Sequence, residues 1–174
     1  MAYSLEPVSQ DCYPGTTVLV NKLNIRDEAT LNEAEALITY INASKLEYCP
    51  LEGVFDFAHY KAIHKFLFSD LYDWAGQTRT VNFSKKGTDF CPAEKIESQA
   101  KLIFDRLQEQ NYFKGLPHDA FVEEITDFYC STNYLHPFRE GNGRTQRAFL
   151  TQLIRNAGHD LNWSAGYRQE LCAN

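Results

Sequence analysis

Apolar residues recur three or four positions apart in five separate stretches of this 174-residue chain, and that spacing places them on one side of an α-helix. The stretches are residues 27–45, 57–71, 92–111, 118–134 and 142–157. In the first of them, the residues predicted to face the core are Leu31, Ala34, Ile38 and Ile41. The pattern therefore predicts an all-α fold in which amphipathic helices share one core.

Composition narrows the class of protein further. With 44% hydrophobic and 14% aromatic residues, the chain has enough apolar surface for a folded domain with a core built largely from rings. No apolar stretch reaches the roughly 18 residues of a membrane span, and residues 1–10 do not resemble a signal peptide, so we expect a soluble, cytoplasmic protein that binds no membrane. A formal net charge of −6 disfavours direct nucleic-acid binding.

The cysteines give no sign of a metal centre or a disulfide framework. Five cysteines are spread along the chain, with no Cys-x-x-Cys pair and no close cluster with histidine. We therefore expect neither structural zinc nor disulfides.

Residues 79–90 have a different character from the helical stretches. β-forming residues alternate there and are followed by Lys86-Gly87, which predicts a small hairpin. A lone hairpin is marginally stable and must pack against something. Two interpretations stay open: a structural flap, or an edge strand that pairs with an extended peptide.

The chemically richest segment is residues 136–147, HPFREGNGRTQR. Gly141-Asn142-Gly143 forms a turn in which two positions lack a Cβ, so backbone amides can converge at the start of the fifth predicted helix. The N-terminus of a helix is electropositive. The turn is therefore a candidate anion cradle.

Charged and basic side chains surround this cradle. Arg144 and Arg147 lie three residues apart on one side of the helix and offer planar donors to phosphate oxygens. Glu140, directly before the turn, suits a Mg²⁺ ion that bridges two phosphate groups. His136 supplies a base with a pKa near neutrality. Together these residues predict a site for a Mg²⁺-bound polyphosphate.

Residues 136–147 match every fixed position of the motif HPFx[D/E]GNGRxxR, so the chain resembles the Fic-domain family. The resemblance extends to Leu71-Tyr72-Asp73-Trp74-Ala75-Gly76-Gln77 followed by Arg79, and to the hairpin in the place of the family's flap. It implies a single Fic domain over residues 1–174: an all-α helical bundle with a small β-hairpin flap and an irregular N-terminal segment. A truncated C-terminus stays open.

The resemblance implies an activity and a role for each motif residue. Fic proteins transfer AMP from ATP to a hydroxyl side chain of a target protein. Here the implied roles are general base for His136, Mg²⁺ ligand for Glu140, and phosphate binding for Gly141, Asn142, Gly143, Arg144 and Arg147. Phe138 is expected to pack inward and hold the loop. ATP and Mg²⁺ are the expected substrate and cofactor.

The resemblance also favours the edge-strand interpretation of the hairpin. The family's flap pairs with the backbone of the target protein and clamps the side chain to be modified. The corresponding residues are Val81, Asn82, Phe83, Ser84 and Lys85.

The absence of one sequence pattern bears on which protein partners we expect. Many Fic proteins carry an inhibitory helix with the pattern [S/T]xxxE[G/N], but no Ser or Thr in this chain is followed by Glu four residues later. The resemblance therefore implies a toxin restrained by a separate small antitoxin, whose glutamate pairs with the second motif arginine. Fic toxins suggest DNA gyrase or a related topoisomerase as the target.

Other activities stay open. Relatives transfer UMP or phosphocholine, and the Doc-type branch phosphorylates its target but carries Ala and Lys where this chain has Gly141 and Gly143. A catalytically silent nucleotide-binding module is the alternative that is not an enzyme.

Overall fold

A computed structural model of the chain describes residues 11–161, except residue 83 and residues 86–87. Its α-helices are α1 (Glu28–Tyr48), α2 (Phe57–Phe68), α3 (Ile96–Glu109), α4 (His118–Leu135) and α5 (Asn142–Asn156), with short 3-10 helices η1 (Ala93–Lys95) and η2 (Asn111–Phe113). The predicted all-α class and the five predicted helices are confirmed. The largest differences lie at three helix ends: α1 runs three residues beyond the predicted residue 45, α2 ends three residues before residue 71, and α3 begins four residues after residue 92.

The early end of α2 has a local cause. The Leu71 amide binds the Phe68 carbonyl, three residues back, at 2.9 Å, which tightens the last turn, and the Tyr72 amide shares the same carbonyl at 3.0 Å. At the other end of α2, the Asp56 carboxylate accepts a hydrogen bond from the amide of His59 at 2.8 Å. This N-cap stabilises the first turn.

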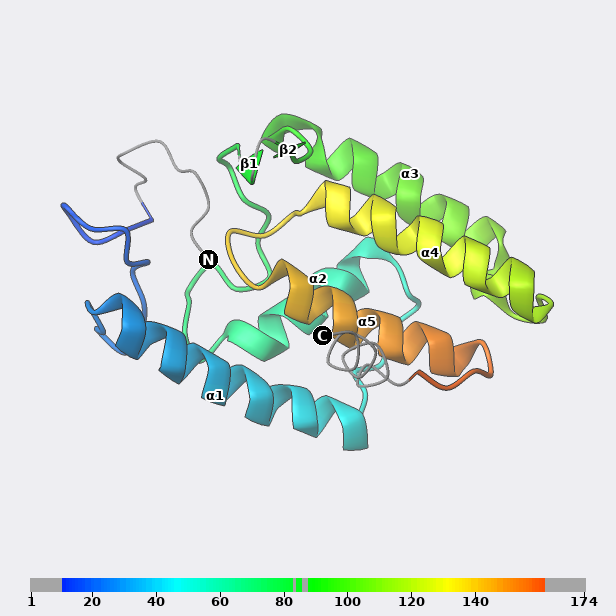
Figure 1. The fold of residues 1–174 in the computed structure, drawn as a ribbon, viewed down its shortest axis with the longest axis horizontal. Helices are drawn as coiled ribbons and strands as arrows, with labels where there is room; N and C mark the ends of the chain where they lie inside the picture. The colour runs from blue at the N-terminus through cyan, green and yellow to red at the C-terminus, as the bar shows by residue number, and fades with distance from the viewer. Residues whose placement is uncertain (1–10, 83, 86–87, 162–174) are drawn as a thin grey trace, which may run out of the picture.

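The helices pack around α2 and α5, which lie at the centre of the bundle (Figure 1). α5 contacts α2 and α4, while α3 runs alongside α4 and α1 packs against α2. The junction between α4 and α5, which contains the motif, therefore lies close to α2. The hairpin lies near the start of α3 and the end of α4 (Figure 1).

Aromatic rings form the centre of the core, as the composition predicts. Phe149 is fully buried, and its ring centroid lies 5.2 Å from that of Tyr60 and 5.7 Å from that of Phe104. Tyr60 in turn stacks on Phe138 at 5.7 Å. Phe138 is fully buried, so the motif loop is anchored in the core by this ring.

The buried side of α1 agrees with the prediction in part. Leu31 is buried and Ile38 packs partly buried against the core, but Ile41, which the spacing placed in the core, is 45% exposed. The buried residues of the helix are Leu31, Glu35, Thr39, Asn42 and Leu46. Glu35 and Thr39 face inward toward Arg144 of the motif, as described below, and the side-chain amide of Asn42 donates to the Leu67 carbonyl of α2 at 3.3 Å.

The predicted hairpin is short in the described part of the chain. β1 (Ser84–Lys85) pairs antiparallel with β2 (Thr88–Asp89), with Ser84 opposite Asp89 and Lys85 opposite Thr88. The predicted Lys86-Gly87 turn lies outside the described residues. Among the described helices, none is both long enough and apolar enough to cross a membrane.

Candidate active site

The junction between α4 and α5 is a closed loop. His136 ends α4 in the left-handed conformation, with φ 42° and ψ 57°, and Pro137 follows it. The side chain of Asn142 then closes the loop, because its Oδ1 accepts from the amide of Phe138 at 2.8 Å and its Nδ2 donates to the Phe138 carbonyl at 2.7 Å. The Asn142 side chain therefore shapes the loop and is buried.

Glycine is required at position 141, directly before α5. Gly141 has φ 78°, and a Cβ at this position would lie 2.1 Å from Cζ of Phe68. The first hydrogen bond of α5 runs from the Thr145 amide to the Gly141 carbonyl at 3.0 Å. The amides of residues 142–144 come before this ladder, so they are the donors that a helix N-terminus offers to an anion.

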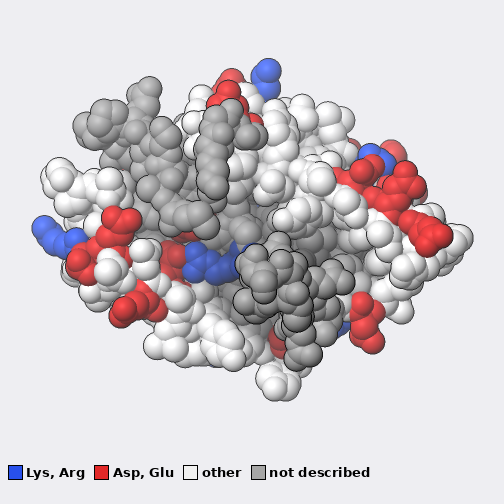
Figure 2. Space-filling view, viewed as in Figure 1, with Lys and Arg blue, Asp and Glu red and all other residues white. Residues whose placement is uncertain are grey.

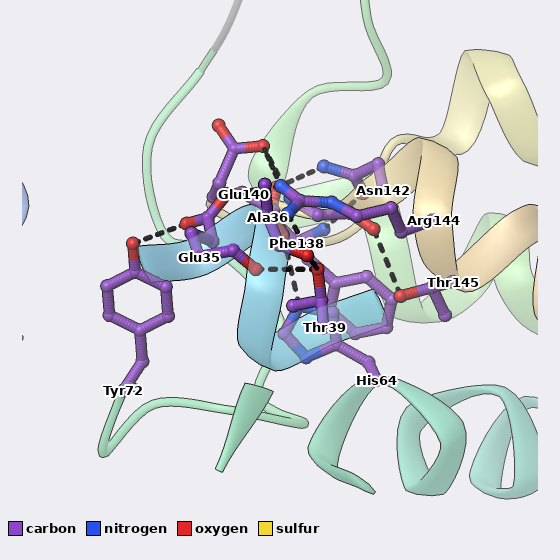
Figure 3. Close-up of polar contacts among 11 residues, drawn as sticks. Glu35, Ala36, Thr39, His64, Tyr72, Phe138, Glu140, Asn142, Arg144 and Thr145 are labelled. Carbon is purple, nitrogen blue, oxygen red and sulfur yellow. Dashed lines mark hydrogen bonds and ion pairs between the residues drawn. The ribbon is translucent and has the colours of Figure 1, made fainter. Parts of the chain in front are cut away.

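Glu140 is held by one carboxylate oxygen. Its Oε1 accepts from the Gly141 amide at 2.8 Å and from Arg144 Nη2 at 3.3 Å, while Oε2 has no hydrogen bond to a described residue (Figure 3). The side chain is 28% exposed. The described residues hold no cluster of three or more metal-ligating side chains. Mg²⁺ needs only one or two carboxylates when substrate phosphates complete its shell, so the outward Oε2 fits this ion.

The two motif arginines have different surroundings. Arg144 Nη2 pairs with Glu35 of α1, and Nη1 donates to Thr39 Oγ1 at 3.2 Å (Figure 3). The guanidinium also lies 4.9 Å from the centroid of the Phe68 ring. Arg147 is exposed, and its guanidinium has no hydrogen bond or ion pair within the described part of the chain. Figure 2 shows basic side chains at the centre of this face, between α1 and the start of α5, with acidic side chains on the α1 side.

The imidazole of His136 has a defined tautomer. Its Nδ1 lies 3.3 Å from the carbonyl oxygen of Asn133, which can only accept, so Nδ1 carries the proton and Nε2 is the basic nitrogen. The ring stacks on Phe90 with centroids 3.8 Å apart, and the residue is only 7% exposed. No hydrogen bond joins His136 to Glu140 or to either motif arginine among the described residues. Of these groups, Glu140 and Arg144 are in direct contact, and His136 lies at the α4 end of the same loop.

Arg79 connects the hairpin to His136. Its Nε donates to the His136 carbonyl at 2.7 Å, Nη1 to the Val81 carbonyl at 2.6 Å and Nη2 to the Cys91 carbonyl at 2.5 Å. Its own amide binds the Pro137 carbonyl at 2.8 Å. Burial lowers the pKa of the guanidinium from its ordinary value. Arg79 thereby fixes both ends of the hairpin segment to the backbone of the motif.

His64 of α2 supports the loop between α4 and α5. Its Nε2 donates to the Glu140 carbonyl at 3.0 Å, and its Nδ1 accepts from the Gly76 amide at 2.8 Å. The ring stacks on Phe138 with centroids 3.8 Å apart. Burial, with a smaller contribution from the charge of Arg144, lowers its pKa to about 4. The imidazole is therefore neutral at pH 7 and bridges two backbone groups.

The structure describes most of the residues predicted to dock a target. Asn82 Oδ1 accepts from the Ala93 amide at 2.8 Å, which fixes the start of the hairpin to η1. Ser84 and Lys85 form β1, although the side chain of Lys85 is not described. Phe83 lies outside the described residues.

Sequence reasoning assigned no role to three residues that shape this site. Arg79 enters the prediction only through the resemblance, and the sequence pattern singles out neither His64 nor Glu35. A signal was present for Glu35. Together with Thr39 and Asn42 it forms a polar row at helical spacing, which in a buried helix indicates polar partners.

Comparisons with known proteins agree with this geometry. The Fic/DOC family model matches residues 54–154. The chain is 41% identical over 165 residues to the protein adenylyltransferase VbhT of Bartonella schoenbuchensis, covering 94% of this chain and 34% of VbhT. It is 40% identical over 151 residues to a probable protein adenylyltransferase Fic of Escherichia coli, covering 87% of this chain and 74% of that protein.

A solved structure shows the same fold. The BepC protein of Bartonella tribocorum, crystallised with bound AMPPNP, superposes with a TM-score of 0.82 at 32% identity, over 93% of this chain and 86% of BepC. The chain spans about a third of the length of VbhT. The match of the family model to more than half of the chain, the identities and the shared fold lead to one conclusion: this protein belongs to the Fic/DOC family.

Proposed function

We propose that this protein is a protein adenylyltransferase, which transfers AMP from ATP to a Tyr, Ser or Thr hydroxyl of a target protein. The hydroxyl oxygen attacks the α-phosphorus, the bond from that phosphorus to the bridging oxygen of the β-phosphate breaks, and pyrophosphate leaves. The hydroxyl proton passes to Nε2 of His136. The observation that carries this proposal is the Nδ1 contact with the Asn133 carbonyl, which supports Nε2 as the nitrogen that accepts the proton.

The junction residues suit the other demands of the reaction. The amides of residues 142–144 precede the hydrogen-bond ladder of α5, and the Arg147 cation lies exposed beside them, which suits an anionic polyphosphate. Glu140 would hold Mg²⁺ through Oε2. That ion, when bound, neutralises charge on the phosphate oxygens. The relatives named protein adenylyltransferase and the AMPPNP bound to BepC support ATP as the substrate.

The hairpin is proposed to present the target. Phe90, which follows β2, stacks on the imidazole of His136, so a peptide paired with the hairpin would run close to the base. Val81, Asn82, Phe83, Ser84 and Lys85 are the proposed docking residues. DNA gyrase or a related topoisomerase is the first target to test.

Control by a separate antitoxin is part of the proposal. Arg144 is already paired with Glu35, whereas Arg147 is exposed and its guanidinium has no hydrogen bond or ion pair in the described part of the chain. A glutamate supplied by another protein could therefore pair with Arg147 and occupy the position of the outermost phosphate.

The reaction is tested with ATP that carries the label at one of two phosphorus atoms, because the labelled product shows which phosphate is transferred. The purified protein is incubated with bacterial lysate, or with purified gyrase, and with ATP labelled at either the α- or the γ-phosphorus. We expect label on protein only from the α-phosphorus. Label only from the γ-phosphorus would identify a kinase, and label from neither would favour a silent nucleotide-binding module. Competition with UTP or CDP-choline distinguishes transfer of UMP or phosphocholine.

A further inference from the structure

The buried side of α1 is polar where it faces the motif. Glu35 and Thr39 are one helical turn apart and are 7% and 2% exposed. Buried polar side chains are costly unless they are paired. Both are paired here with the same group, the guanidinium of Arg144 (Figure 3). An α-helix outside the motif thus contributes directly to the charge around the candidate phosphate site.

Glu35 is held on both sides. Its Oε1 accepts from Arg144 Nη2, and its Oε2 accepts from the hydroxyl of Tyr72 at 2.5 Å (Figure 3). Burial and the neighbouring Glu35 carboxylate both raise the pKa of Tyr72, so this hydroxyl stays protonated and donates. The Tyr72 ring stacks on Trp74 with centroids 4.4 Å apart. The carboxylate of Glu35 is therefore a fixed anchor.

Arg144 links the fixed carboxylate of Glu35 to Glu140 in the motif. The same Nη2 that pairs with Glu35 lies 3.3 Å from Glu140 Oε1, and the Phe68 ring lies beneath the guanidinium. One cation thus lies between two carboxylates. Its hydrogen bonds and much of its charge are already used within the protein, which leaves Arg147 as the cation better placed for an outer phosphate.

We propose that Glu35 is a positioning residue, which holds Arg144 so that Arg144 orients the Glu140 carboxylate for a Mg²⁺–nucleotide complex. This inference rests on the proposed function, and it changes the predicted role of Arg144 from a phosphate ligand to a support for the metal ligand. Support groups of this kind commonly matter nearly as much as the ligands that they orient.

The test measures binding of Mg²⁺ with the non-hydrolysable analogue AMPPNP, so it requires no target protein. AMPPNP binding to the whole chain is followed by calorimetry over a range of Mg²⁺ concentrations. In Glu35→Gln, which keeps the size of the side chain, the Mg²⁺ concentration for half-maximal binding should rise about 10-fold. Glu33→Gln removes an exposed carboxylate from the same helix and should leave the titration unchanged.

A second variant keeps the test valid if Glu35→Gln folds poorly. Tyr72→Phe removes only the hydroxyl that holds Glu35 and should shift the titration in the same direction by a smaller factor, with circular dichroism confirming the fold. An unchanged Mg²⁺ titration in a folded Glu35 or Tyr72 variant would reduce Glu35 to a residue that merely packs α1. A wild-type protein that binds no Mg²⁺–AMPPNP would overturn the proposed function as well.

Discussion

Nε of Arg79 donates a 2.7 Å hydrogen bond to the carbonyl oxygen of His136, and the other two guanidinium nitrogens bind carbonyls at the two ends of the hairpin segment. His136 has a left-handed backbone, so its carbonyl points where no helical partner is available. Arg79 satisfies that carbonyl and couples the proposed docking hairpin to the proposed base.

Replacing Arg79 should therefore impair transfer more than nucleotide binding. Arg79→Lys keeps the charge but cannot reach three carbonyls at once, and each lost charge-assisted hydrogen bond costs about 1.5–3 kcal/mol. We expect AMP transfer to fall at least about tenfold and the free energy of unfolding to fall by about 2–4 kcal/mol. Arg106→Lys, at an exposed arginine, is the matched control. Equal effects of the two substitutions would contradict the coupling.

His136 can be replaced without straining its backbone. Asn tolerates the left-handed conformation better than Ala does, so His136→Asn removes the base at little conformational cost. We expect transfer to fall about 10²–10⁴-fold, because a positioned base contributes that much. AMPPNP affinity, measured by calorimetry, should change by no more than a few-fold. Loss of both transfer and affinity would make His136 part of the scaffold instead.

Glu140→Gln tests the metal ligand. The amide can still accept from the Gly141 backbone but is a poor ligand for Mg²⁺, so the Mg²⁺ concentration that supports half-maximal transfer should rise about tenfold or more. Transfer by the wild type should stop when EDTA removes the metal. Glu94→Gln, at an exposed position outside the motif, serves as the control. A metal titration identical to that of the wild type would exclude Glu140 as the ligand.

Gly141→Ala and Gly143→Ala form a pair of variants with opposite expectations. At position 141 the added Cβ would meet Phe68 at 2.1 Å with φ at 78°, and the combined strain should lower the free energy of unfolding by about 2–5 kcal/mol. At position 143 the nearest contact would be Arg147 Nη1 at 3.4 Å, so stability should change by about 1 kcal/mol at most. Urea denaturation measures both. Equal losses would mean that the loop can move away from Phe68.

His64 should make stability fall in acid. Its pKa is about 4 in the folded protein and about 6.5 when unfolded, so the unfolded chain binds the extra proton first as the pH falls. The contribution of neutral His64 is complete above about pH 6.5 and is lost between there and about pH 4, a change of about 3 kcal/mol.

His64→Gln tests this by retaining one donor and one acceptor without titrating. The free energy of unfolding is measured by urea denaturation between pH 7 and pH 4.5 for both proteins. The variant should lose less stability across that range than the wild type. Parallel curves would assign the acid sensitivity to other groups, such as His59, whose pKa is also lowered by burial.

The helices and the motif were predictable from sequence because both depend on local patterns. Apolar spacing located the five helices, and the Gly141-Asn142-Gly143 turn marked the start of α5. On α1 the spacing located Leu31 but not the buried Glu35, whose partner lies 109 positions away in the sequence. Arg79 and His64 bind backbone carbonyl and amide groups, which almost every residue type carries, so the sequence gives no sign of these partners. Pairings of this kind depend on tertiary geometry.

The loop at the start of α5 is shaped by groups that do no chemistry: the amide clamp of Asn142, the tight fit of Gly141 over Phe68, and the bridge from His64. The scaffold and the reactive groups are thus largely separate sets of residues. A substitution of Arg147, which takes no part in these three contacts, should therefore change phosphate binding while the loop keeps its shape.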